Sequence, residues 1–173
     1  MKLTTRLMTL ATTLAVSGTV LAGGAQGVDE GALVRAELDA LQAATLHLQR
    51  LDNAINEGWS TDISGCVEMP GVGGMGHHWA DLARFDGEVS LLEPEVLVFE
   101  PMPDGSRRLV ALEYIVPVAA WAGGDETAPR LFGRDFHVLE AIDSWILHVW
   151  LYRNNPAGMF EDFNPNVNCD HAE

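Results

Sequence analysis

Four apolar segments dominate the second half of this chain and limit its fold more than any other feature. Pro103-Asp104-Gly105 predicts a tight turn between the first two segments, and Gly123-Gly124-Asp125 opens the loop before the third. Short apolar segments connected by such turns predict an antiparallel β-sheet of about four strands. The expected strands are residues 94–101, 107–117, 131–139 and 144–153.

A long helix is predicted ahead of these strands, over residues 29–57. Its apolar residues recur at roughly helical spacing, as Val34, Leu38, Leu41 and Leu48 illustrate, and Gly58 follows as a stop. His47 lies in this helix, and we expect it at the surface. A helix followed by consecutive hairpins predicts an α+β fold, in which one helix packs on the antiparallel sheet of a single domain, residues 26–173.

Residues 60–87 and the C-terminal tail lack a regular pattern. The first segment contains the Gly-rich stretch 69–76, and we predict a long irregular loop, a feature that is more often functional than not inside a compact domain. We interpret it as a lid or arm that delivers His78 to the sheet. The tail, residues 154–169, contains Asn-Pro twice and predicts a coil.

The N-terminus and the two cysteines indicate export. Residues 1–25 resemble a signal peptide, with a basic start, an apolar run and small residues at its end, so we expect a periplasmic or extracellular protein with no membrane span. In an oxidising compartment Cys66 and Cys169 favour one disulfide, which would stabilise the fold by about 4–5 kcal/mol in the chain-entropy model. Two metal-binding thiolates are the alternative.

The charge and the missing motifs exclude several classes of function. The formal net charge is −15, so the chain would repel nucleic acids and anionic membrane surfaces. No Gly-rich phosphate loop and no nucleophile elbow occur in the sequence. The expected partner is therefore a small-molecule ligand or substrate, and the oligomeric state stays open.

Two ionisable residues occur inside strongly apolar strand segments. Glu113 lies within Leu-Val-Ala-Leu-Glu-Tyr-Ile-Val, where alternation places it on one face with Leu109, Ala111 and Ile115. His148 lies in a segment that is apolar on both faces, so neither orientation gives it plain solvent. A buried imidazole or carboxylate needs a hydrogen bond, a proton or a metal ion to offset its burial.

Four residues form the predicted metal site: His78, Glu113, His137 and His148. Hairpin neighbours can bring the last three onto one face, and the Gly-rich turn can add His78. Two or three imidazoles with one carboxylate suit Zn, Fe, Mn or Cu. Haem, held by His and Met beside an apolar pocket, is a minor option. For His77 we favour a place on the loop surface, and for His171 a place in the exposed tail.

Three functions remain open from these residues. The leading one is a small metalloprotein whose site lies in an aromatic pocket lined by Trp79, Tyr114 and Trp150. Whether it is an enzyme stays open, and in a metal-dependent enzyme Glu113 and His148 would be the catalytic residues. The second is a metal-free binding module for a small apolar ligand or a partner in the cell envelope. The third is a metal-free enzyme in which a histidine acts as general acid or base and Glu113 orients it.

Several short segments, in this order, resemble a group of small, uncharacterised exported bacterial proteins. The resemblance covers most of the chain after the signal peptide and implies that the Gly-Met-Gly-x-His and Leu-His-Val-Trp segments serve one functional design. It therefore favours His78 over His77, and it implies no activity, substrate or cofactor. The segments are residues 54–59, 66–68, 74–78, 94–97, 113–114, 131–133, 147–150 and 155–160.

Overall fold

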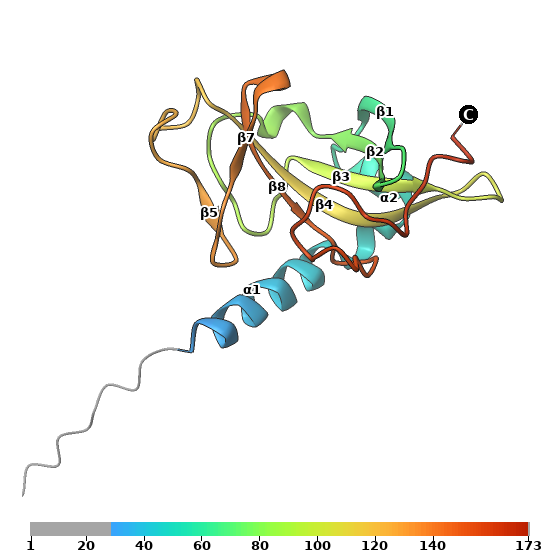
Figure 1. Cartoon of the computed structure of the whole chain (residues 1–173), viewed down its shortest axis with the longest axis horizontal. Coiled ribbons are helices and arrows are strands. Elements are labelled where there is room, and N and C mark those ends of the chain that lie inside the picture. The colour runs from blue at the N-terminus through green and yellow to red at the C-terminus, as the bar shows by residue number, and fades with distance from the viewer. Residues whose placement is uncertain (1–28, 173) are drawn as a thin grey trace, which may run out of the picture.

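The computed structural model describes residues 29–172, which form an α+β fold around one six-stranded antiparallel sheet (Figure 1). The predicted signal peptide lies outside these residues. A two-stranded sheet, β5 (Arg130–Leu131) with β6 (Arg134–Asp135), stands apart from the large one. The large sheet has the order β1 (Thr61–Met69), β2 (Gly73–Ala80), β3 (Val96–Pro101), β4 (Arg107–Pro117), β8 (Ser144–Val149) and β7 (His137–Leu139).

The predicted long helix is divided. It consists of α1 (Glu30–Thr45), which continues into a 3-10 turn, η1 (Leu46–Gln49), and of a separate short helix α2 (Leu51–Asn56). The break falls at Arg50, whose extended backbone forms a β-bridge with Arg108 of β4. Periodicity alone could not show this break, because the bridge depends on a residue far along the chain.

The prediction of an irregular loop over residues 60–87 was wrong. Most of it is the hairpin of β1 and β2, and only its second part, with the 3-10 turn η2 (Leu82–Arg84), is irregular. The Gly-rich stretch is therefore part of a strand and not a lid. Its glycines let other backbone segments approach, since a Cβ on Gly74 would lie 2.8 Å from Val167 O and one on Gly76 would lie 2.6 Å from Phe99 O.

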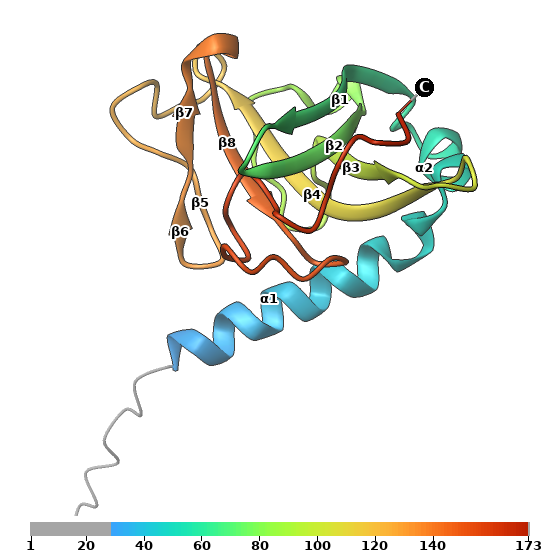
Figure 2. The ribbon, with the colours of Figure 1, turned by 45° about the vertical axis from the view of Figure 1, so that its right-hand side comes forward.

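The expected disulfide is present and ties the tail to this hairpin. Cys66 of β1 is bonded to Cys169, 103 residues later. Gly74 of β2 also exchanges two backbone hydrogen bonds with Asn164 of the tail. The C-terminal segment thus runs beside β2 in Figure 2, on the way to the end of the chain.

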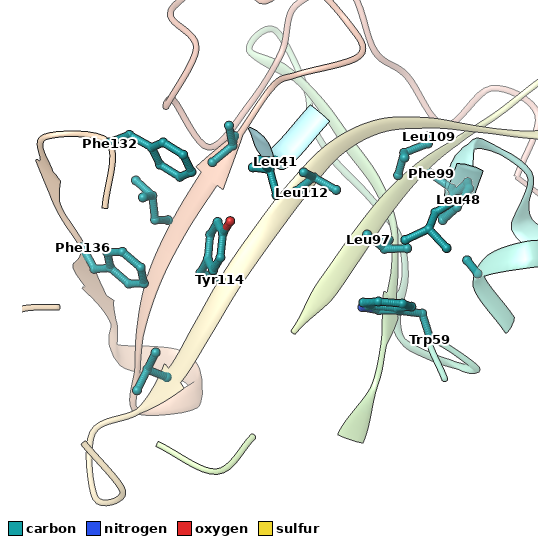
Figure 3. Packing of buried hydrophobic residues seen from close by; sticks show 14 of the residues in the cluster. Leu41, Leu48, Trp59, Leu97, Phe99, Leu109, Leu112, Tyr114, Phe132 and Phe136 are labelled. Carbon is teal, nitrogen blue, oxygen red and sulfur yellow. The ribbon is translucent and has the colours of Figure 1, made fainter. Parts of the chain in front are cut away.

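Helical side chains cover one face of the sheet and build the larger core. Leu41 of α1 and Leu48 of η1 pack there with Leu112 and Tyr114 of β4 and with Phe132 (Figure 3). The same cluster also contains Trp59, Leu97, Phe99, Leu109, Phe136, Leu147 and Val149. This face is predominantly aliphatic and aromatic.

The other face carries a second cluster and the ionisable residues. Ala111, Ile115 and Ile146 belong to this cluster. Leu109, expected on the same face, packs in the first cluster because the pairing of β3 with β4 shifts at this point: Val98 faces Ala111 and Phe99 faces Leu109, which leaves Val110 as an extra residue. Among residues 29–172, no helix is long and apolar enough to cross a membrane.

Candidate metal centre

Three strands of the sheet, β2, β4 and β8, bring three ionisable side chains together. Glu113 of β4 and His148 of β8 are direct cross-strand partners. His78 of β2 is paired with Val98 of β3, and its side chain reaches over this strand toward Glu113. All three are buried, at 6 % exposure for His78, 3 % for Glu113 and 1 % for His148.

The donor atoms of this triad surround one point. His78 Nε2 lies 3.6 Å from Glu113 Oε2, and His148 Nε2 lies 3.5 Å from Glu113 Oε1. One donor atom from each residue lies within 4.8 Å of the other two. The rings of His78 and His148 are nearly perpendicular, with centroids 5.9 Å apart.

Ser64 fixes the orientation of His78. The Ser64 hydroxyl donates to Gly65 O at 2.7 Å and lies 2.8 Å from His78 Nδ1. Because a hydroxyl has one proton, the Nδ1–H of His78 donates to Ser64 Oγ, and the lone pair of Nε2 points to Glu113. An imidazole bound at Nδ1 in this way is oriented for a metal at Nε2.

Glu113 has an oxygen without a hydrogen bond. Its Oε2 is buried and has no partner among the described residues, although it faces His78 Nε2. Two acceptors that face each other in a buried place repel, and an unpaired buried carboxylate oxygen costs more than about 1–3 kcal/mol. A cation between these two atoms would remove both penalties.

His148 lies between two carboxylates. Its Nδ1 is 3.3 Å from Asp162 Oδ1 in the tail, while its Nε2 faces Glu113. Burial disfavours the charged imidazole, but the negative charges of Glu113 and Asp162 outweigh burial and raise the pKa of His148. Asp162 is shifted in the matching direction: burial opposes the change, yet contacts with His148 and His137 lower the pKa of its carboxyl.

His78 is shifted in the opposite direction. Burial lowers the pKa of the His78 imidazole, and the nearby Glu113 only partly opposes this. The triad therefore contains an imidazole held neutral, as metal binding requires, and one that holds a proton more tightly than usual.

The geometry of the triad suits one metal ion. Ligands at about 2.0–2.2 Å around a tetrahedral ion lie about 3.3–3.6 Å from one another. The two histidine–carboxylate distances fall in this range, each to a different oxygen of Glu113, and one donor atom from each residue lies within 4.8 Å of the other two, so a bound ion would draw the three side chains slightly closer. A ring bound to a carboxylate through its second nitrogen, as His148 is placed beside Asp162, is the common arrangement around zinc. Ser64 thus orients the His78 ring through a hydrogen bond, whereas Asp162 lies 3.3 Å from His148 Nδ1 without hydrogen-bond geometry.

The triad lies at one side of a pocket of about 400 Å³. Most of the pocket wall is aliphatic, with Ile63, Ile115 and Ile146 among its residues, so the three polar groups are concentrated in one place. Pockets of this volume, mostly apolar with a few convergent polar groups, are typical of small-molecule sites.

The other predicted ligand, His137, lies outside the triad. It pairs with Ile146 across β7 and β8, its side chain is half-exposed, and its Nε2 lies 3.2 Å from Asp162 Oδ2. The structure thus connects His137 to the triad only through Asp162. His47 is exposed, as expected, and bonded to Glu57 at 2.8 Å, and His171 is exposed in the tail.

The prediction of a surface position for His77 was wrong. This residue is buried in β2 at 7 % exposure, with Nδ1 2.7 Å from Asp62 Oδ2. Hydrogen bonds from His77 and from the backbone of Ser64 and Gly65, against the effect of burial, lower the pKa of Asp62. Alternation along β2 puts His77 and His78 on opposite faces, so only His78 joins the triad.

The aromatic residues expected around the pocket are placed differently. Trp79 and Tyr114 follow His78 and Glu113 directly, so they point to the opposite face and pack in the helix-covered cluster. Trp150 stays near the site, with its ring stacked at 6.4 Å from that of His148. The pocket itself is aliphatic and methionine-rich rather than aromatic.

Two residues of the site were missed in the sequence, Ser64 and Asp162. Ser64 lies in the stretch that looked irregular, and Asp162 lies in a tail without periodicity. The only signal in the sequence was the disulfide, which brings the tail back to the hairpin.

Comparisons with family models, with curated proteins and with solved structures found no match, so the resemblance to exported bacterial proteins stays a prediction.

Proposed function

We propose that this protein is an exported metalloprotein in which His78, Glu113 and His148 bind one divalent metal ion beside an apolar pocket for a small molecule. The observation that carries the proposal is the buried Oε2 of Glu113, which has no hydrogen bond and faces the lone pair of His78 Nε2. The disulfide fits an oxidising compartment, which favours export.

The donor set narrows the metal and its chemistry. Two imidazoles and one carboxylate with an open position are typical of catalytic zinc and of non-haem Fe(II), and they suit a single ion better than haem. His78, Glu113 and His148 all line the pocket, so an ion held by them would be within reach of a substrate oxygen there. We propose that the ion acts there as a Lewis acid or redox centre, and that Glu113 serves as a ligand or general base.

Elemental analysis of protein prepared without a histidine tag tests this proposal. We expect about one metal ion per chain in the wild type, and its loss in His78→Ala, His148→Ala and Glu113→Gln. His47→Ala is the matched control, because this exposed histidine is far from the triad in the fold and should keep the metal. A folded wild type that takes up no zinc, iron, manganese or copper would contradict the proposal.

A metal-free acid–base enzyme is the second candidate. Its support is His148, which holds its proton more tightly than usual between Glu113 and Asp162. This candidate predicts a pH–rate profile that chelators do not change, whereas the metal proposal predicts that chelators abolish activity. A metal-free binding module, the third function, predicts ligand binding with no turnover.

A further inference from the structure

The pocket beside the triad has a polar end and apolar walls. Its polar side chains collect around the triad, where Ser64 is bonded to His78 and Asp162 lies beside His148. The remaining lining consists of Ile, Val, Leu, Met and one Phe. A ligand that fills this pocket therefore needs one polar group at one end and an apolar remainder.

The spacing of residues along the strands sets the distance between the polar end of the pocket and its apolar walls. Ile115 and Ile146 are cross-strand partners, placed two residues from the Glu113–His148 pair on the same face. Two residues along a strand correspond to about 7 Å. Both isoleucines are buried, at 4 % and 1 % exposure, so an apolar floor begins directly beside the polar end.

The apolar surface continues outward to the rim. Ile63 and Met69 of β1, Leu139 of β7 and Ile142 of η3 (Glu140–Ile142) all line the pocket and are 38–50 % exposed. Large aliphatic side chains that are half-exposed around one opening indicate a binding mouth rather than a core. Met69 and Met75 add walls that can adjust to ligands of different shape.

The lining also excludes several ligand classes. Among the described residues that line the pocket, none is Arg or Lys, so a phosphate or sulfate group would lack the bidentate cationic partner that usually binds it. Sugars and nucleotides carry polar groups on all sides, and the aliphatic walls would leave those groups without hydrogen bonds. The volume, about 400 Å³, lies toward the lower end of the range of about 300–1,000 Å³ that is typical of small-molecule pockets, which suits a small ligand.

We propose that the ligand class is a short aliphatic monocarboxylate, whose carboxylate binds the metal at the triad and whose hydrocarbon chain lies along Ile115 and Ile146 toward Ile142. The inference rests on the proposed metal site, because a divalent ion there would offset the negative charge that the carboxylate brings close to Glu113 and Asp162. The expectation of a hydrocarbon chain rests only on the apolar residues that line the pocket.

Calorimetric titration with butanoate, hexanoate and adipate tests the ligand class, on both the zinc-loaded and the metal-free protein. We expect hexanoate to bind the zinc-loaded protein about tenfold more tightly than butanoate, as two buried methylenes imply. Adipate should bind at least tenfold more weakly than hexanoate, because its second carboxylate would lie against aliphatic walls. Metal content is measured on the same samples.

Variants of exposed residues separate the pocket from the fold. Ile142→Asp places a charge at the mouth and should weaken hexanoate binding at least tenfold without changing zinc content. Leu82→Asp is the matched control, since Leu82 is similarly exposed but does not line the pocket, and it should leave binding unchanged.

Each outcome decides between the two proposals. Zinc binding with equal affinities for butanoate, hexanoate and adipate would overturn the aliphatic ligand and leave the metal site standing. Absence of zinc binding would overturn both the metal site and the metal-bound carboxylate, and hexanoate binding as tight to the metal-free protein as to the zinc-loaded one would overturn the role of the metal in holding the carboxylate.

Discussion

The two faces of the central sheet are built from the same strands and serve opposite purposes. On the helix-covered face, Leu112 and Tyr114 are fully buried among apolar side chains, and the Tyr114 hydroxyl donates to Leu91 O at 2.6 Å. On the other face, Glu113 and His148 are equally buried, but some of their polar atoms have no hydrogen bond among the described residues. Alternation along β4 separates the two roles by a single residue.

This difference shows where stability and chemistry reside in the molecule. The helix-covered face buries apolar surface, which is the main source of folding free energy. The opposite face, which carries the triad and is called the site face below, instead buries ionisable groups, and each buried polar atom without a hydrogen bond lowers stability by about 1–3 kcal/mol. The predictions below change one face at a time and measure whether the other responds.

Removal of the disulfide should have the largest effect. In Cys66→Ala/Cys169→Ala, the loss of a cross-link over 103 residues should lower the free energy of unfolding by about 4–5 kcal/mol. The tail also carries Asp162 to His148, so metal affinity should fall as well. Urea unfolding and metal titration measure both effects, and a variant with unchanged metal affinity would show that the site face does not depend on the cross-link.

Shortening a buried side chain on the helix-covered face should have the second-largest effect on stability. Leu112→Ala removes a fully buried side chain and should lower the free energy of unfolding by about 2–5 kcal/mol. Metal stoichiometry of the folded variant should not change, since Leu112 points away from the triad. The matched control is Leu33→Ala on α1, which is 50 % exposed and should change stability by less than about 0.5 kcal/mol.

Metal binding at the triad should raise the free energy of unfolding by a smaller amount than these two changes lower it. Zinc at about one hundred times its Kd should raise the free energy of unfolding by about 2.7 kcal/mol. The gain should vanish in Glu113→Gln and should shrink as pH falls, because the metal must displace the proton that His148 holds tightly. Thermal unfolding with and without a chelator measures the effect, and an equal gain in Glu113→Gln would exclude the triad as the binding site.

The sequence predicted the apolar part of the fold better than its polar part. Three of the four predicted strands were confirmed, as β3, β4 and β8, and so was the disulfide, because hydrophobic runs, turn residues and export-type cysteines act locally or by simple chemistry. The prediction of one strand over residues 131–139 was wrong, since this segment divides into β5, β6 and β7, and the large sheet has six strands rather than about four. The hairpin of β1 and β2 was missed, since its glycines serve contacts with the distant tail and hide the strand pattern.

The candidate site was predicted in part for the same reason. Glu113 and His148 stood out because they interrupt apolar strands, and the structure makes them cross-strand partners. Ser64 and Asp162, which lie beside the histidines, carry no local signal. Their roles arise from strand register and from the return of the tail, which no spacing along the chain encodes.

A buried carboxyl directly before β3 should make the stability of the protein depend on pH. Glu95 is 2 % exposed, and its Oε2 accepts a hydrogen bond from the backbone N–H of Ile115 at 3.0 Å. Burial raises the pKa of Glu95 to about 8 from an ordinary value of 4.5, with Asp86 adding to the rise, while the hydrogen bond from Ile115 and the charge of Arg84 oppose it. The folded protein therefore keeps a proton on Glu95 that the unfolded chain releases.

Stability should consequently fall as pH rises from 4.5 to about 8, and below this window Glu95 contributes no pH dependence. The expected slope is up to about 1.4 kcal/mol per pH unit. Glu95→Gln keeps the shape of the side chain without the titration and should remove this slope, whereas Glu88→Gln, at an exposed position nearby, should not. Urea unfolding of the metal-free proteins across this pH range measures it. An unchanged slope in Glu95→Gln would place the pH dependence on the site face instead, where the pKa of His148 is raised by Glu113 and Asp162 against the effect of burial.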